Sequence, residues 1–292
     1  MTIKCAFLGL GVMGYPMAGH LVKKGFEVTV YNRTIAKAQK WSQEYGAAFK
    51  ETAFEAVKDA DFVFACLGND DDVRSVVLGE SGAFADMKPG AVFVDHTTDS
   101  ADLARELFAV CKKRGLGFLD APVSGGQTGA VNGVLTVMVG GESDVFEKAK
   151  PVIDAYACNV THLGPAGNGQ LAKMVNQIAL AGAVQGLSEA IAFGMNAGLD
   201  MKKVLKVLEK GAAGSWQMAN RGETMVDDKF DFGFAIDWMR KDLGIAMAEA
   251  RRNGSSLPVT ALVDQFYGEL QAVGASRMDT SSLIKRLPRK KA

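Results

Sequence analysis

The feature that most constrains the fold is a change of pattern near residue 165. Before it, short apolar runs such as IKCAFLGL and FEVTVYN alternate with helical patterns, and after it every periodic segment is helical. Alternating strands and helices indicate βαβ units and a mostly parallel, doubly wound sheet, and a change to helices alone indicates a second domain. We therefore predict an α/β fold, with one domain over residues 1–164 and an all-α domain over 165–292.

The expected elements follow from apolar periodicity and from the positions of Gly and Lys near helix ends. In the first half, further strands are expected at 61–68, 91–97, 117–123, 135–141 and 159–164, with helices near 12–24, 35–45, 71–78, 100–114 and 143–156. In the second half, helices are expected at 168–197, 200–211, 215–227, 236–253, 258–273 and 279–286.

Composition argues against several classes of protein. Lys plus Arg and Asp plus Glu number 33 each, so the chain lacks the excess charge that draws nucleic acid or an anionic membrane. The basic tail LIKRLPRKKA is expected to be a solvated, frayed terminus. The four cysteines and three histidines are scattered, which predicts neither a disulfide framework nor a metal site.

Targeting signals are also not expected. The first residues show no charged segment followed by an apolar one, so we predict no secretory signal. The apolar stretch over 174–197 carries amide, hydroxyl and carboxylate side chains, which predicts a buried helix and no membrane span. These features favour a cytoplasmic protein.

A glycine-rich loop indicates a bound dinucleotide. The run FLGLGVMG places Gly9, Gly11 and Gly14 in G-x-G-x-x-G spacing, after an expected strand and at the start of an expected helix. The first glycine permits the tight turn, the second lets a pyrophosphate approach the backbone, and the third lets the helix pack closely on the strand. The anion would lie at the helix N-terminus. We therefore expect a Rossmann domain whose cofactor contacts this loop, including Leu10, Val12 and Met13.

The end of the second strand bears on the choice of cofactor. NAD enzymes usually place Asp or Glu there to bind the ribose 2′-hydroxyl, whereas this chain has Asn32, Arg33 and Thr34. Arg33 would pair with a 2′-phosphate and stack on adenine, although an exposed arginine with no ligand is the alternative interpretation. We predict NADP as the cofactor, with NAD as the alternative.

Lys173 has an unusual environment in the sequence. It is the single Lys or Arg between Pro151 and Met201, in a stretch that is otherwise small and apolar. An ammonium buried among apolar groups is costly unless it is paired or used, so Lys173 is either catalytic or a structural lysine whose tip reaches solvent. Asn176 lies on the same helical face, one turn later.

Four separated motifs together resemble the β-hydroxyacid dehydrogenase family. They are FLGLGVMGYPMAGHL near the start, DAPVSGG at 120–126, GNGQLAKMVNQ at 167–177 and KDLGIA at 241–246, in the order that the family has them. That family includes 3-hydroxyisobutyrate dehydrogenases, tartronate semialdehyde reductases and glyoxylate/succinic semialdehyde reductases. The sequence departs from it at 66–68, where CLG replaces the frequent MLP.

The resemblance implies a role for each matching residue. Lys173 would be the catalytic lysine, and Asn176 would help to hold the substrate. The carboxylate of the substrate would bind to Ser124, Gly125 and Gly126.

Lys241 and Phe234 would lie at the nicotinamide end. The cofactor would also contact Leu67, Gly68 and Thr98. Apart from the resemblance, Arg221 and Arg240 are candidates for binding a second carboxylate, although surface charges are the expected alternative.

We therefore expect an NADP-dependent oxidoreductase of short 3-hydroxy or ω-hydroxy acids and their semialdehydes. An imine reductase is one alternative, although such relatives usually have Asp or Tyr at the position of Lys173. A catalytically silent nucleotide-binding scaffold is another, although it would typically lack the lysine. The expected partners are a small-molecule substrate and further copies of the chain, as a homodimer or homotetramer, because the apolar helix after Lys173 exceeds what one small domain can bury.

Overall fold

The computed structural model describes residues 2–290 and divides into two compact units. They comprise Met1–Lys173 and Met174–Ala292, so the division falls within one long helix. The predicted boundary at 164/165 lies just before this helix and remains our proposal for the end of the dinucleotide-binding domain.

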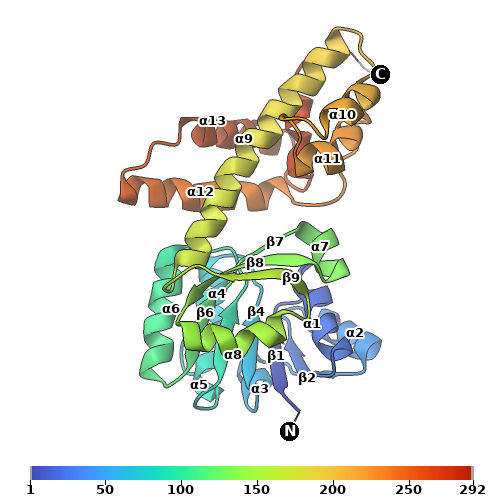
Figure 1. The fold of residues 1–292 in the computed structure, drawn as a ribbon. Helices are drawn as coiled ribbons and strands as arrows, with labels where there is room; N and C mark the ends of the chain where they lie inside the picture. The colour runs from blue at the N-terminus through green and yellow to red at the C-terminus, as the bar shows by residue number, and fades with distance from the viewer. Residues whose placement is uncertain (1, 291–292) are drawn as a thin grey trace. The chain divides into compact units, whose positions relative to one another are not determined.

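The first unit contains a mixed, mostly parallel sheet (Figure 1). Six strands run parallel in the order β3-β2-β1-β4-β5-β6; β8 then pairs antiparallel with β6 and with β7, and parallel with β9. Their bounds are β1 Lys4–Leu8, β2 Glu27–Tyr31, β3 Ala48–Phe49, β4 Phe62–Ala65, β5 Val92–Asp95, β6 Gly117–Asp120, β7 Val123–Ser124, β8 Leu135–Gly141 and β9 Ala157–His162.

Helices cover both faces of this sheet. Along β1, Cys5 and Phe7 belong to one apolar core and Ala6 and Leu8 to another, as the two-residue period of a strand requires. The first core includes residues of α1 Gly14–Lys23, α2 Ile35–Tyr45, α7 Gly126–Asn132 and α8 Ser143–Ile153. The second includes residues of α3 Ala53–Val57, α4 Asp70–Val77, α5 Ala83–Asp86 and α6 Ala101–Lys113. The predicted doubly wound domain is confirmed.

The second unit is helical, which confirms the predicted all-α half. It contains α9 Asn168–Asn196, whose first turn belongs to the first unit, with α10 Met201–Leu208, α11 Trp216–Val226, α12 Ile236–Asn253 and α13 Pro258–Ala272. Apolar side chains of α9 enter two cores, one with α12 and α13 and one with α10 and α11. The predicted helix over 279–286 is instead a 3-10 segment, Thr280–Arg286.

The long helix α9 differs along its length. Its Gly169 packs against neighbouring backbone, whereas a Cβ added at Gly182 or Gly186 would meet nothing within 4 Å. Among the residues that the structure describes, α9 alone is long and apolar enough to cross a membrane by length and composition. Half of its most apolar window is buried in the structure, and the core helix of a soluble protein has the same properties.

The basic tail is not frayed over the residues described, which corrects our expectation. Asn196 donates to the Pro288 carbonyl and accepts from the Lys290 amide, at 3.0 and 2.9 Å. Arg289 donates to Asp228 at 2.7 Å, and 13% of its side chain is exposed. The tail is therefore held against the helical unit up to Lys290, and residues 291 and 292 lie outside the described range.

Candidate functional site

The glycine loop has the close contacts that its spacing predicts. Gly9 has a φ of +98°, and a Cβ there would collide with the Cys66 carbonyl. A Cβ on Gly14 would collide with the carbonyl of Gly9, so helix α1 approaches the loop closely. Gly11 is exposed, and a Cβ there would meet nothing within 4 Å. The loop therefore has one open glycine, which fits the close approach of a pyrophosphate.

The end of β2 is fixed to this loop. The Asn32 Oδ1 accepts from the Leu10 amide at 2.9 Å, and its Nδ2 donates to the Thr34 carbonyl at 3.0 Å. Asn32 thus holds the glycine loop in place, a role that the sequence interpretation missed. Of the remaining loop residues, Val12 is 61% exposed and Met13 is half-buried.

Arg33 follows Asn32 and extends into solvent. Its side chain is 85% exposed, and its Nη1 lies 3.1 Å from Oδ1 of Asp72 at the start of α4. An ion pair this exposed contributes little to stability because water screens it. Arg33 can therefore exchange Asp72 for another anion at small cost.

Next to the loop, the ends of β4 and β5 are joined through a hydroxyl. The Leu67 amide donates to Thr97 Oγ1 at 2.9 Å, and the Thr97 amide donates to Asp95 Oδ1 at 2.9 Å. Thr97 is buried, whereas its predicted neighbour Thr98 is half-buried, like Gly68. The contact from Leu67 to Thr97 shows how this chain orders the CLG turn that departs from the family pattern.

The VSGG segment forms a short strand and a turn at the surface. Ser124 pairs with Thr136 across β7 and β8, while Gly125 and Gly126 have φ values of +125° and +61°. Both glycines are exposed. Positive φ favours glycine, so the sequence GG is required for this turn into α7.

Lys173 lies beside this segment. Its residue exposure is 8%, and its Nζ donates to the Val123 carbonyl at 2.9 Å. The ammonium therefore contacts the residue that precedes Ser124 in β7. Unit 1 thus brings the glycine loop, Leu67, Ser124 and Lys173 to the carboxyl ends of its strands.

Two buried polar residues at the base of α9 were not predicted. The Asp120 carboxylate accepts from the amides of Gly167 and Gln170 at 2.8 and 3.0 Å. Burial raises the pKa of Asp120 to about 6, although these two amides oppose the shift. The Gln170 side chain donates to the Thr97 carbonyl at 2.7 Å. Asp120 is the first residue of the DAPVSGG motif, but its hydrogen-bond partners are backbone amides, which no sequence pattern identifies.

A buried histidine lies behind the same strand ends. His96 Nδ1 lies 2.6 Å from the Ala121 carbonyl, and its Nε2 lies 2.8 Å from the Tyr156 hydroxyl. Because a carbonyl only accepts, Nδ1 carries the proton and Nε2 accepts from Tyr156. Burial lowers the pKa of His96 to about 4, so the ring is neutral at pH 7.

The second unit links its predicted residues through two side chains that were missed. Asn176 Nδ2 donates to Gln177 Oε1 at 2.8 Å, and Gln177 Nε2 donates to Asp242 Oδ2 at 2.6 Å. The other oxygen of Asp242 lies 3.2 Å from Lys241 Nζ. Asn176 and Lys241 are thus joined by a buried amide and a buried carboxylate, Gln177 and Asp242.

The other predicted residues of the second unit have separate surroundings. The half-buried Phe234 donates its amide to Asp279 Oδ2 at 2.8 Å. Arg221 lies over the rings of Trp216 and Phe232, each 4.9 Å away, and its Nε is 3.4 Å from Asp279. Arg240 donates to both oxygens of Asp264 and to Gln271. Neither arginine is a simple surface charge.

Two family models together match almost the whole chain. The model for the NAD binding domain of 6-phosphogluconate dehydrogenase matches residues 4–164. The model for the NAD-binding region of NADP-dependent 3-hydroxyisobutyrate dehydrogenase matches residues 167–287.

The chain belongs to the β-hydroxyacid dehydrogenase family.

Relatives agree with this assignment over their full length. An uncharacterized oxidoreductase of Shewanella frigidimarina is 61% identical, and 99% of each chain is covered. The 2-hydroxy-3-oxopropionate reductase of Escherichia coli is 35% identical, with 98% and 97% covered. The solved structure of Mycobacterium tuberculosis 3-hydroxyisobutyrate dehydrogenase with L-serine is 32% identical, has a TM-score of 0.87, and covers 98% of this chain and 99% of its own. This family member is therefore an NAD(P)-dependent oxidoreductase that acts on hydroxyl donors.

The imine reductases are more distant. The solved imine reductase of a Pseudomonas species is 18% identical, with a TM-score of 0.61 and with 98% and 99% of the chains covered. At this identity the likeness shows the fold alone.

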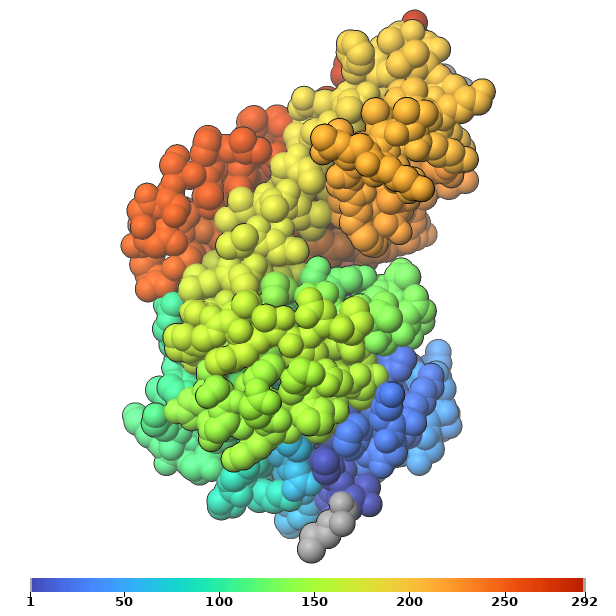
Figure 2. Space-filling view, in the orientation of Figure 1, coloured from blue at the N-terminus to red at the C-terminus, as the bar shows by residue number. Residues whose placement is uncertain are grey.

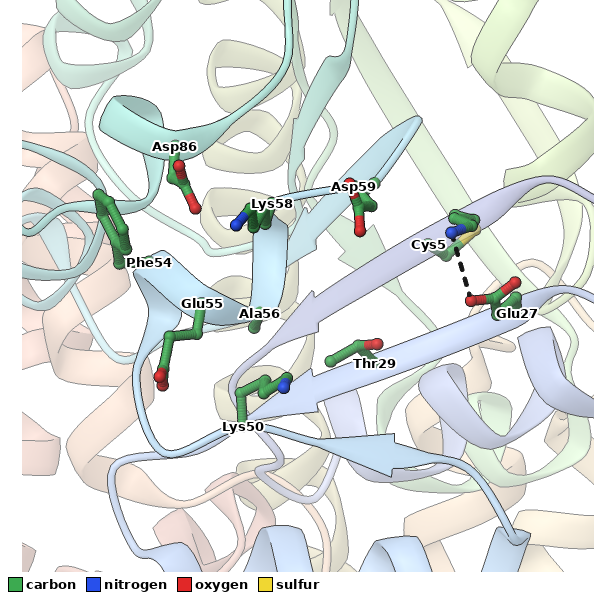
Figure 3. Close-up of a pocket in the computed structure, with 12 residues that line it drawn as sticks. Cys5, Glu27, Thr29, Lys50, Phe54, Glu55, Ala56, Lys58, Asp59 and Asp86 are labelled. Atoms are coloured by element: carbon green, nitrogen blue, oxygen red, sulfur yellow. Dashed lines mark ion pairs between the residues drawn. The ribbon is translucent and has the colours of Figure 1, made fainter.

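A hollow in the first unit lies away from the residues predicted for the site. It has a volume of about 340 Å³ and is lined by α3 with its flanking residues and by residues near the amino ends of β1 and β2, such as Cys5 and Glu27 (Figure 3). The glycine loop follows the opposite, carboxyl end of β1. The lining mixes basic and acidic side chains, such as Lys50 and Glu55, and we assign it no role in the reaction. Within residues 2–290, no group of three or more His, Cys, Asp or Glu could hold a metal ion.

Proposed function

We propose that this family member transfers a hydride between NADP(H) and a short 3-hydroxy or ω-hydroxy acid or its semialdehyde. The observation that carries the proposal is the buried Lys173 ammonium, bound to the carbonyl next to Ser124. The chain thereby has a proton donor beside a surface turn suited to a carboxylate. The name of the Escherichia coli relative, 2-hydroxy-3-oxopropionate reductase, supports a semialdehyde of this size.

The residues present fit a dinucleotide. The open face of Gly11 would accept the pyrophosphate, Arg33 the 2′-phosphate, and Leu67, Gly68 and Thr98 the nicotinamide half. When bound, the nicotinamide supplies the hydride in reduction and accepts it in oxidation.

The substrate would be oriented by the VSGG turn. The exposed backbone of Gly125 and Gly126, with the Ser124 hydroxyl, would bind the carboxylate. In reduction, the carbonyl carbon gains the hydride while its oxygen takes a proton from the Lys173 ammonium. In oxidation, the neutral Lys173 amine removes the proton from the hydroxyl. Asn176 would orient the substrate, with its own amide held by Gln177.

An activity screen tests the proposal. Purified protein with NADPH or NADH is assayed against glyoxylate and tartronate, methylmalonate and succinic semialdehydes, and in reverse with glycerate, serine, 3-hydroxyisobutyrate and 4-hydroxybutyrate. Turnover of a member of this set supports the proposal. Turnover of cyclic imines alone would favour the imine reductase alternative, and cofactor binding with no turnover would favour the silent scaffold.

Arg33→Ala is expected to weaken NADPH binding and to leave NADH binding almost unchanged. A charge-assisted hydrogen bond is worth about 1.5–3 kcal/mol, or about tenfold to a hundredfold in affinity. Because Arg33 is 85% exposed, high salt should reduce the wild-type preference. Titration of both cofactors into wild type and variant, at two salt concentrations, measures this. Equal weakening of both cofactors would mean that Arg33 stacks on adenine without binding the phosphate.

Substitutions in the VSGG turn are expected to raise the substrate KM more than the cofactor Kd. Ser124→Ala removes a hydroxyl that would bind a charged group, which predicts a rise of about tenfold. Gly125→Ala adds backbone strain, because Gly125 has a φ of +125°. Gly115→Ala, at another positive φ in the same unit and with nothing within 4 Å of an added Cβ, controls for strain alone. Weaker NADPH binding with an unchanged KM would contradict the assignment.

Two further properties belong to this proposal. We infer self-association, as a dimer or tetramer, from exposed apolar side chains on α9, including Phe193 at 74% exposure. Figure 2 shows part of α9 uncovered between α10 and α13, and light scattering would give the number of subunits. We also propose a cytoplasmic location, which the balanced charge and the scattered cysteines of the sequence favour.

A further inference from the structure

We propose that Asp120 is a positioning residue of the reaction, because its carboxylate fixes the first turn of α9 and thereby the place of Lys173. The inference rests on the proposed role of Lys173. Asp120 itself is completely buried and contacts the helix through backbone amides.

The N-terminal end of α9 presents amide groups that suit a carboxylate. The first amides of a helix have no partner within the helix, and they are partially positive. The two oxygens of Asp120 accept one hydrogen bond each, from Gly167 just before α9 and from Gln170 in its first turn. Hydrogen bonds to an ionised acceptor are stronger than neutral ones, so this carboxylate sets both the position and the direction of the helix end.

The Asp120 carboxylate and the helix end are tightly packed. A Cβ added to Gly169 would lie 2.5 Å from the carbonyl oxygens of both Asp120 and Met138. A Cβ added to Gly140 would lie 2.5 Å from Asp120 Oδ1. The helix end can therefore reach the carboxylate only because both positions are glycine, and the contact leaves no room for adjustment.

The same helix turn and strand segment position Lys173. Gln170 and Lys173 are three residues apart, so they share a face of α9. Gln170 donates to the Thr97 carbonyl, and Lys173 donates to the Val123 carbonyl, on the segment that begins with Asp120. One end of the segment from Asp120 to Val123 thus holds the helix, and the other end receives the ammonium. A shift of the helix end would move Nζ relative to the VSGG turn, where a misplacement of about 1 Å can cost a hundredfold in rate.

Full-length Asp120→Asn tests the inference, because asparagine has the same shape but only one acceptor. We expect kcat to fall by about tenfold to a hundredfold, with cofactor Kd and substrate KM within about twofold of wild type. Amide hydrogen exchange should accelerate at Gly167 or Gln170. Asn168→Ala is the matched control, since it removes a different first-turn hydrogen bond, to the Leu163 carbonyl, and should leave kcat unchanged.

A double-mutant cycle separates positioning from general stabilisation. If Asp120 acts through Lys173, Asp120→Asn should have little further effect on the residual kcat of Lys173→Met. An equal loss of kcat in both backgrounds, or an unchanged kcat with accelerated exchange, would overturn the inference. If Asp120→Asn does not fold, Asp120→Ser, which keeps one acceptor in a smaller side chain, provides the same comparison. Normal turnover of Lys173→Met would refute the proposed function instead.

Discussion

Lys173→Ala is expected to lower kcat by about 10²–10⁴-fold through loss of proton transfer, and further through loss of alkoxide stabilisation. Cofactor binding should be retained, because the contacts expected for the dinucleotide lie in the glycine loop and at Arg33. Steady-state kinetics and cofactor titration on the same preparation measure both properties.

The control for this prediction separates charge from packing. Lys173 is buried, so alanine also removes the aliphatic stem and leaves a cavity. Lys173→Met keeps most of the stem and removes the ammonium. Both variants should lose activity to a similar extent, while Lys173→Met should be closer to wild type in thermal stability. Near-normal turnover in either variant, with an intact circular dichroism spectrum, would contradict the catalytic assignment.

His96 is expected to make the first unit less stable in acid. Burial lowers its pKa from 6.5 to about 4, so between these values the unfolded chain binds a proton that the folded chain does not. The contribution of His96 to the free energy of unfolding is therefore complete above pH 6.5 and is lost as the pH falls toward 4. From the pKa shift, the loss amounts to about 3 kcal/mol at pH 4.

Buried carboxyl groups change the pH dependence of stability in the opposite direction. The effect of His96 must therefore be measured as a difference between wild type and a variant. Burial raises the pKa of Asp95, and that of Asp120 to about 6, so the folded chain holds protons that the unfolded chain has released above pH 3.8. The contribution of these carboxyl groups to the free energy of unfolding increases as the pH falls from 6 to 3.8. It partly cancels the loss caused by His96. The stability difference between wild type and His96→Gln isolates the histidine, and it should shrink by about 3 kcal/mol between pH 7.5 and pH 4.

Urea unfolding of the first unit can be followed through Trp41. This tryptophan is completely buried in that unit, and the other two, Trp216 and Trp238, can be replaced by phenylalanine in all variants. Tyr156→Phe is the control, since it removes the partner of Nε2 but leaves the ring buried, and it should keep the wild-type pH dependence. A wild-type-to-His96→Gln difference that stays constant with pH would mean that His96 titrates normally in the folded chain.

The fold could be predicted wherever one local rule determines the backbone. The period-two pattern of strands and the spacing of Gly9, Gly11 and Gly14 each fix geometry within a few residues, so the sheet and the tight loop were predicted correctly. The strands β3 and β7 were missed as separate elements because each has two residues, too few to show a period. The tail was predicted wrongly because its partners, Asn196 and Asp228, are distant in sequence.

The site was less predictable for the same reason. Lys173 could be singled out because a lone charge in an apolar helix conflicts with its surroundings. Asp120 and Gln170 contact backbone groups 47 to 73 residues away, and nothing in their own neighbourhood indicates this. Asn32 was expected to contact the cofactor, but its side chain accepts a hydrogen bond from the Leu10 amide. It occupies the position where NAD enzymes have a carboxylate, and its side-chain amide has a different partner.

The glycines of α9 differ in the space around them, and this difference determines which positions of the enzyme tolerate substitution. Gly169 and, in β8, Gly140 lie against backbone atoms and the Asp120 carboxylate, so sequence libraries that vary them would mostly return chains with a displaced helix end. Gly182 and Gly186 have no such neighbours, and alanine there would strengthen the helix by about 1 kcal/mol each if no partner subunit packs on them. Substrate range is thus best evolved by varying loops around a helix whose first turn is left untouched.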